Sequence, residues 1–257
     1  MNSSEWLAYF RQNRRDRMPV VWEPRVPVPE KLRAELGRSL AKFQLAESSA
    51  GLHLRAAAAR TGDRDYASAI ELFVVEEAEH ARLLARVLDL LETRPLSRHW
   101  ADTWGRRARR LAGLYSEVVV LLAAEVILLR FYGTVRRGVR QPAIAAVCGQ
   151  ILHDQKFHVR FHCESLHGQF AGNRLVRGLF CYALTAVFTA GSLVVAWDHR
   201  RTLAAVGCSA GEFLAGAWRN FRAARDAVYY GRPFALDATD QEDVIHSWMG
   251  RRRHGAI

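Results

Sequence analysis

A set of acidic, amide and imidazole residues occurs twice in this chain at one fixed offset. The first copy is Glu47, Glu77 and His80, and the second copy, 78 positions later at each member, is Glu125, Gln155 and His158. Residues three apart share one face of an α-helix, so each copy predicts one ligand on a first helix and a pair on a second. Two such helix pairs carry the ligand pattern of a metal pair inside a four-helix bundle, with one carboxylate replaced by an amide.

The remainder of the chain favours helices. Four of its seven prolines lie between residues 19 and 29, and no segment alternates at period two, so no strand is predicted. We expect an N-terminal arm over 1–29 with a short amphipathic start, a helical domain over 30–230, and a polar basic tail over 231–257. The predicted helices, with caps at Asp63 or Asp65 and at Ser209 with Glu212, run over about 29–60, 65–93, 107–137, 142–168, 175–197 and 210–230.

Glu125 stands in an unusually apolar segment. Residues 118–129 read VVVLLAAEVILL, in which eleven of twelve residues are apolar. A carboxylate buried there must be neutralised, paired with an arginine or bound to metal, because an isolated buried charge costs several kcal/mol. The other acidic and imidazole residues recur at the same offset, which favours a bound metal ion at Glu125.

Over about residues 35–168, the chain resembles the ferritin-like superfamily of dinuclear carboxylate proteins. That superfamily includes ferritins, rubrerythrins, the ribonucleotide reductase small subunit, acyl-carrier desaturases and N-oxygenases. The resemblance rests on Glu47, the run Glu76-Glu77-Ala-Glu-His80, Glu125, and the run Asp154-Gln155-Lys-Phe-His158. It implies an all-α fold, a ferritin-like four-helix bundle with two additional C-terminal helices.

The resemblance also implies roles for these residues. Glu47, Glu77 and His80 would bind one metal, and Glu125 and His158 the other, as two iron ions or an iron–manganese pair. Glu76 and Asp154 would each hold the imidazole of the opposite ligand pair in orientation.

Gln155 departs from the pattern of the superfamily, which has a glutamate at this position. A neutral amide is a poor bridge between two cations, so we expect the second metal to bind more weakly. Asp154 is a possible substitute, and His162 is either an extra ligand or an ordinary histidine on the helix face. Tyr132, seven residues past Glu125, either lines a substrate pocket or carries a radical, or simply packs in the core. His153 and His167 are interpreted as surface or packing residues.

Charge, cysteines and hydropathy limit the partners. The net charge of +11 favours anionic partners or a solvated arginine surface, and no nucleic-acid motif is present. The four widely spaced cysteines are typical of reduced thiols in a cytoplasmic protein, and no signal peptide is visible. Residues 178–197 carry no formal charge, so they form either a buried fifth helix, which we expect, or a membrane-associated one.

We therefore expect a dioxygen-activating oxidase or oxygenase with two metal ions, acting on a small apolar substrate or one bound to an acidic carrier protein. The alternatives are a ferritin-like scaffold or membrane-associated protein with a degraded metal site, and a ferroxidase. A homodimer is possible.

Overall fold

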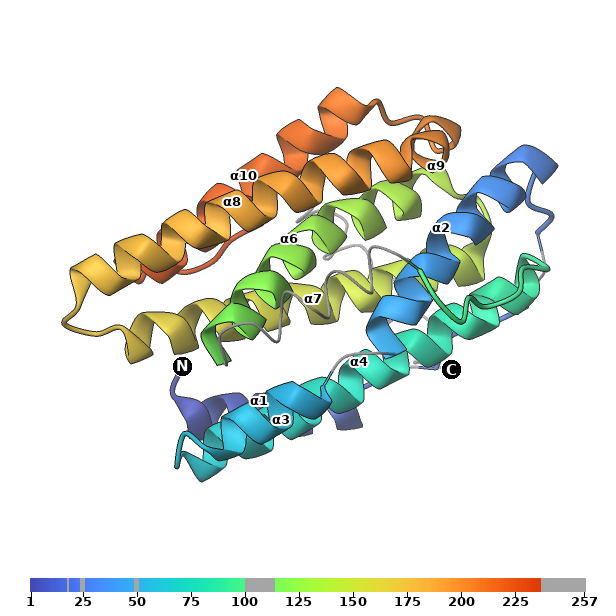
Figure 1. Cartoon of the computed structure of the whole chain (residues 1–257). Helices are drawn as coiled ribbons and strands as arrows, with labels where there is room; N and C mark the ends of the chain where they lie inside the picture. Colours follow the sequence, from blue (N-terminus) through green and yellow to red (C-terminus); the bar gives the residue numbers. More distant parts are fainter. Residues whose placement is uncertain (18, 24–25, 49–50, 100–113, 237–257) are drawn as a thin grey trace. The chain divides into compact units, whose positions relative to one another are not determined.

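The computed structural model describes residues 1–17, 19–23, 26–48, 51–99 and 114–236, and Figure 1 labels the helices of these residues. All regular structure in these ranges is helical, which confirms the prediction of an all-α fold. The helices are α1 (Ser3–Arg15), α2 (Glu30–Ser48), α3 (Leu52–Ala59), α4 (Arg64–Leu90), α6 (Leu114–Gly138), α7 (Pro142–Gln169), α8 (Arg174–Asp198), α9 (Arg200–Ala205) and α10 (Ala210–Tyr230). They form two compact units: unit 1, of Met1–Arg17 and Gly37–Leu121, and unit 2, of Met18–Leu36 and Leu122–Ile257.

Helix α4 is the centre of unit 1. It begins after Asp63, whose Oδ1 accepts a hydrogen bond from the backbone N–H of Tyr66 at 2.9 Å, as the predicted cap requires. The amphipathic start of the chain is helix α1, which packs on α4 and buries Trp6, Leu7 and Phe10. These apolar side chains make the first segment part of the core of unit 1, whereas the sequence predicted only an arm.

The helix predicted over 29–60 is broken in two, so that prediction is wrong. Helix α2 ends at Ser48 and α3 begins at Leu52, after Gly51 with φ of 119°. Side chains other than glycine rarely adopt that angle, and a Cβ at position 51 would also overlap the methyl groups of Val74 on α4. The chain therefore turns at Gly51, where α4 comes close to it, and does not continue as one helix.

Helices α7, α8 and α10 of unit 2 begin and end within about two residues of the predicted limits. Pro142 occupies the first turn of α7, and the predicted capping box of Ser209 and Glu212 begins α10. Helix α10 packs against both α7 and α8, and Phe188 of α8 stacks on Phe221 of α10 with ring centroids 4.1 Å apart. Burial of these aromatic side chains joins the three helices into one core.

Two helical segments are long and apolar enough to cross a membrane, judged by length and composition only: Glu117–Gly138 and Arg174–Asp198. The first is 83% buried and the second 33% buried over its most apolar stretch. We expected residues 178–197 to form a helix buried against the bundle. The helix is present as α8, but its burial is confined to one face.

Candidate metal centre

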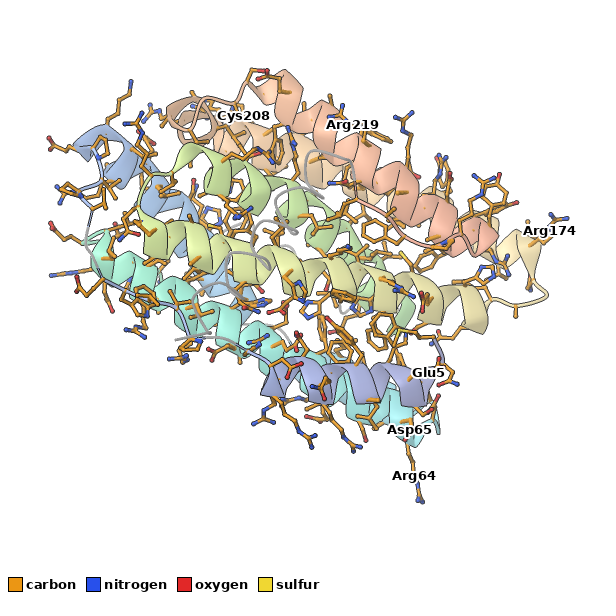
Figure 2. The ribbon with its side chains drawn as sticks, turned by 180° about the vertical axis from the view of Figure 1, so that it is seen from behind. Glu5, Arg64, Asp65, Arg174, Cys208 and Arg219 are labelled. Carbon is orange, nitrogen blue, oxygen red and sulfur yellow. The ribbon has the colours of Figure 1, made fainter. Side chains whose placement is uncertain are left out.

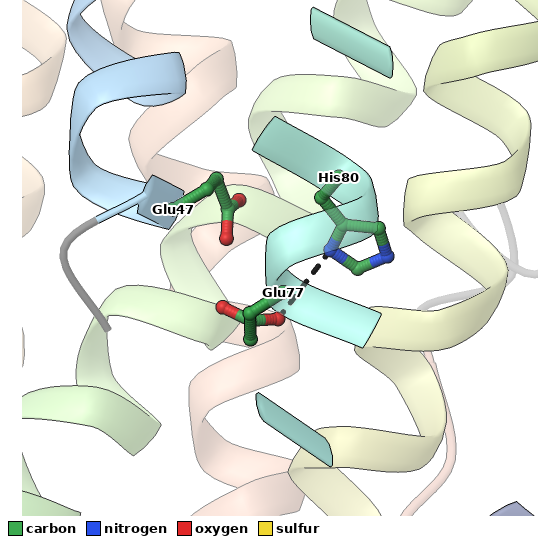
Figure 3. A group of neighbouring side chains, drawn as sticks. All are labelled: Glu47, Glu77 and His80. Atoms are coloured by element: carbon green, nitrogen blue, oxygen red, sulfur yellow. Dashed lines mark ion pairs between the residues drawn. The ribbon is translucent and has the colours of Figure 1, made fainter. Parts of the chain in front are cut away.

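Three predicted ligands converge inside unit 1. Helix α4 presents Glu77 and His80 on one face, and α2 supplies Glu47 from its last turn (Figure 3). One donor atom of each residue lies within 4.8 Å of the donor atoms of the other two, and His80 Nδ1 is 3.4 Å from Glu77 Oε1. The three side chains are 4, 3 and 0% exposed in the order Glu47, Glu77 and His80. The sequence-based grouping of these three residues is thus reproduced in space.

This donor set fits a divalent cation. Two carboxylates and one imidazole offer oxygen and nitrogen ligands of the kind that iron and manganese accept in proteins. Two carboxylates held this close and this far from water repel one another unless a cation or a proton lies between them. Among the residues that the structure describes, this is the one group of three acidic, thiol or imidazole donors with such convergence.

Glu76, the residue before the ligand Glu77, is held by the N-terminal segment. Asn13 Nδ2 donates a hydrogen bond of 2.8 Å to Glu76 Oε1, and Arg17 Nη2 lies 3.7 Å from the same oxygen. These two polar side chains fix the turn of α4 that carries Glu77. The sequence-based role of Glu76, as a partner of an imidazole, stays a prediction.

The second predicted set lies in unit 2, on α6 and α7. Glu125 is 1% exposed, and Gln155, His158 and His162 are fully buried. His162 Nε2 lies 3.5 Å from Glu125 Oε1. The sequence did not decide whether His162 is an extra ligand or an ordinary histidine on the helix face. Spacing alone did not show this position beside Glu125, because the counterpart of His162 78 positions earlier is a leucine. Its role as an extra ligand stays a prediction.

The side chains of Glu125 and Gln155 place polar atoms in this buried region. Neither oxygen of Glu125, and neither Oε1 nor Nε2 of Gln155, has a hydrogen-bond partner among the described residues. Burying such groups without a partner costs free energy, which a bound ion or a molecule attached to it would recover. That position 155 is an altered ligand position stays a prediction.

Asp154 also lies in this buried region of α7. Gln150 Nε2, one helical turn earlier, lies 3.2 Å from Oδ1 and 3.1 Å from Oδ2 of Asp154 and donates to this carboxylate. This contact orients the carboxylate along α7. Its predicted role beside an imidazole stays a prediction.

The remaining candidates have ordinary packing contacts. Tyr132 is fully buried, and its ring meets Phe131 edge-on with centroids 6.0 Å apart. His153 packs on Phe157 at 5.1 Å, and His167 Nδ1 is 3.0 Å from the carbonyl oxygen of Val228. These contacts agree with the interpretation of both histidines as packing residues.

The cysteines are all free thiols, as predicted. Burial raises the pKa of Cys148 to about 12 and that of Cys181 to about 11. Burial, with the nearby Glu125 carboxylate as the next cause, also raises the pKa of Cys163 well above its usual value. A thiol that resists ionisation is a poor metal ligand, so these three cysteines add nothing to the donor set.

A cavity of about 980 Å³ in unit 2 is separate from Glu125. Its lining includes Gly138 at the end of α6, together with Lys31, Arg140 and Arg201. Gly138 lies thirteen positions after Glu125 on α6, which is about 20 Å at the rise of an α-helix. This cavity is therefore not a pocket beside Glu125 and the apolar residues 118–129.

Comparisons of the chain with protein family models, with curated proteins and with solved structures give no match.

Proposed function

We propose that the protein is a non-haem dinuclear metal oxidase or oxygenase built on a ferritin-like bundle, which activates dioxygen to oxidise an apolar or carrier-bound organic substrate. The observation that carries this proposal is the convergence of Glu47, Glu77 and His80, whose donor atoms lie within 4.8 Å of one another in a buried position. The buried pair of Glu125 and His162 in unit 2 adds support, because it supplies donors of the same kind.

In this proposal the two sets bind two ions, either both iron or one iron and one manganese. Glu47, Glu77 and His80 hold one ion, while Glu125 and His158 hold the other, with His162 as a further donor. When bound, the metal pair supplies the electrons that reduce dioxygen. The site of the second metal is the weaker one, because Gln155 contributes no negative charge.

The chain itself contributes two further properties. Burial of all these donors excludes water, which strengthens each electrostatic interaction at the site and protects reactive species from solvent. The apolar residues on either side of Glu125 provide surroundings suited to an alkyl or aromatic group. Tyr132 stays a weaker candidate for a residue that lines the substrate or is oxidised with it.

Metal content and dioxygen consumption test the proposal. The protein is reconstituted anaerobically with Fe(II), or with Fe(II) and Mn(II), and then mixed with oxygen while elemental analysis and stopped-flow absorption are recorded. We expect up to two metals per chain and a transient absorption in the near-ultraviolet or visible range. His80→Ala and His158→Ala should each remove a metal and abolish the transient.

Glu79→Ala is the matched control. Glu79 lies between Glu77 and His80 in the sequence, but its carboxylate forms an ion pair with Arg82 at 2.6 Å on a partly exposed face of α4. This variant should keep both metals and the transient. A trace from His158→Ala that is identical to wild type would eliminate the dinuclear mechanism.

The substitution at Gln155 favours a second candidate, a scaffold whose metal site has degraded. Purified protein that takes up no metal under any reconstitution condition would support the scaffold. A ferroxidase would instead oxidise successive Fe(II) ions and retain ferric iron without any organic substrate. For the enzyme we propose a cytoplasmic location, no nucleic-acid partner and possible dimerisation, and the net charge of +11 suits an acidic carrier protein.

A further inference from the structure

Helix α8 carries an exposed apolar face along its whole length. The large side chains on this face are Leu175, Leu179, Tyr182, Leu193 and Trp197, which are 75, 61, 77, 55 and 64% exposed. Three exposed alanines, at positions 183, 186 and 190, continue the face between them. Large contiguous apolar surfaces on soluble proteins mark interaction sites.

The opposite face of α8 is already occupied. Phe180, Leu184 and Phe188 are buried on that side, and α8 packs against α10 (Figure 1). The helix therefore has a fixed orientation within unit 2, with one apolar face in the core and the other facing outward. A helix held in this way can lie on an apolar medium, but it cannot cross one without leaving α10.

Arginines flank the exposed face at both ends. Arg174 and Arg177 lie in the first turn of α8, and Arg200 and Arg201 follow its last residue; Figure 2 shows Arg174 at the end of the helix. No acidic residue occurs from Leu175 to Trp197. The surface is thus apolar in the middle and positive at the ends.

An aromatic ring stacked with an arginine lies near each end of α8. At its C-terminal end, the Arg200 guanidinium lies 4.8 Å from the ring centre of Trp197. At its other end, Arg177 Nη1 donates a hydrogen bond of 2.8 Å to the carbonyl oxygen of Tyr229, and Arg232 lies 5.0 Å from the ring centre of the neighbouring Tyr230. Tryptophan, tyrosine and arginine are the residues that favour the headgroup region of a bilayer.

Charge distinguishes a bilayer from a second copy of the chain as the occupant. In an antiparallel pairing of two α8 helices, Arg174 and Arg177 of one copy would face Arg200 and Arg201 of the other. A parallel pairing would bring identical arginines together. The one acidic residue of the helix, Asp198, lies 3.7 Å from His199 of the same chain. Anionic lipid headgroups, in contrast, complement the arginines at both ends while the acyl chains cover the apolar middle.

From these observations we propose that the exposed face of α8 docks the protein on an anionic lipid bilayer. The helix lies in the plane of the membrane, with Leu179 and Leu193 in the acyl region and the arginines at the phosphates. This inference is independent of the metal chemistry, because neither α8 nor its flanking arginines contribute a predicted ligand.

Vesicle binding by the full chain tests this proposal. The protein is sedimented with vesicles of phosphatidylcholine alone and with vesicles that contain phosphatidylserine, at low and high salt. We expect binding to the anionic vesicles that weakens with salt, and much weaker binding to the neutral ones. Leu179→Glu and Leu193→Glu should each lower the partition coefficient by about tenfold or more, since each removes one buried apolar side chain and adds a repelled charge.

Val75→Glu is the matched control, because Val75 is also an exposed apolar residue, 37% exposed, but lies on α4. It should bind vesicles like wild type, and circular dichroism should be unchanged in all three variants since each site is exposed. Absence of binding to anionic vesicles would overturn the proposal. So would a concentration-dependent dimer that Leu193→Glu dissociates in the absence of lipid, because α8 would then serve a second copy.

Discussion

Replacing Glu47 with glutamine should change the free energy of unfolding in opposite directions with and without metal. The carboxylates of Glu47 and Glu77 have oxygen atoms no more than 4.8 Å apart in a buried position. Two unit charges at that separation repel by about 3 kcal/mol at an effective dielectric constant of about 20. In the metal-free protein, Glu47→Gln removes this repulsion, so the variant should be more stable than wild type by up to that amount.

Bound metal reverses the order of stability of wild type and Glu47→Gln. A ligand that binds only the folded state, at a free concentration of about 1,000 times its dissociation constant, stabilises that state by about 4 kcal/mol. Wild type should gain this increment, and Glu47→Gln should lose most of it because glutamine is neutral and holds a cation less tightly. The two stability curves therefore cross as metal is added.

Urea unfolding, monitored by circular dichroism with a chelator or with anaerobic Fe(II), measures both quantities. Glu79→Gln makes the same chemical change on the same protein, but its partner Arg82 is largely exposed. Exposed ion pairs contribute little, so this control should change the unfolding free energy by less than about 1 kcal/mol in both conditions. If Glu47→Gln lowers the stability of the metal-free protein and leaves the metal-induced increment intact, Glu47 is not a ligand.

Three other positions give independent tests. Gln155→Glu should raise the occupancy of the second metal; equal stoichiometry near two in wild type and variant, measured by elemental analysis, would show that position 155 does not limit binding. Gly51→Ala should lower the unfolding free energy by about 1–3 kcal/mol, because of its φ of 119° and the overlap with Val74, and an unchanged urea midpoint would contradict this. Asp63→Ala should cost about 1 kcal/mol at neutral pH. Hydrogen bonds from the Ser3 hydroxyl and, second, from the Tyr66 N–H lower the pKa of Asp63 from its ordinary 3.8. The stabilisation by the Asp63 carboxylate is therefore present above pH 3.8 and is lost as the pH falls below it. A difference in unfolding free energy between variant and wild type that persists undiminished at pH 2 would refute the assignment of Asp63 as the cap.

The features that could be predicted from the sequence are local ones. The cap of α4, predicted at Asp63 or Asp65, the first-turn Pro142 and the capping box at Ser209 depend on residues within three or four positions, so a single sequence contains the information. The same holds for the pairing of Glu77 with His80, because helical geometry alone places residues three apart on one face. Glu47 could be grouped with them only through the repeat at 78 positions.

The features that could not be predicted depend on packing between distant segments. The break before α3 accompanies the close approach of Val74 to Gly51, and nothing in the sequence near Gly51 shows that approach. The hydrogen bond from Asn13 to Glu76 joins residues 63 positions apart. His162 on α7 lies beside Glu125 on α6 because of the rotation of each helix about its axis, and the apolar pattern of a helix as extensively buried as α6 does not define that rotation.

The contacts of α1 have a consequence for the order in which the protein folds. Ser3 Oγ donates a hydrogen bond of 2.6 Å to Asp63 Oδ2 at the start of α4, and Asn13 reaches Glu76 just before the ligand turn. Helices α1 and α4 thus run in the same direction, and these two hydrogen bonds join them at positions about one length of α1 apart. Two parallel helices cannot be joined by a short turn, so the intervening chain must first close into a long loop, which slows docking. Since α1 supports the turn that carries Glu77, a newly made chain should reach its full affinity for metal only after this late step, and a one-residue deletion within α1 should delay or weaken metal uptake without removing any ligand.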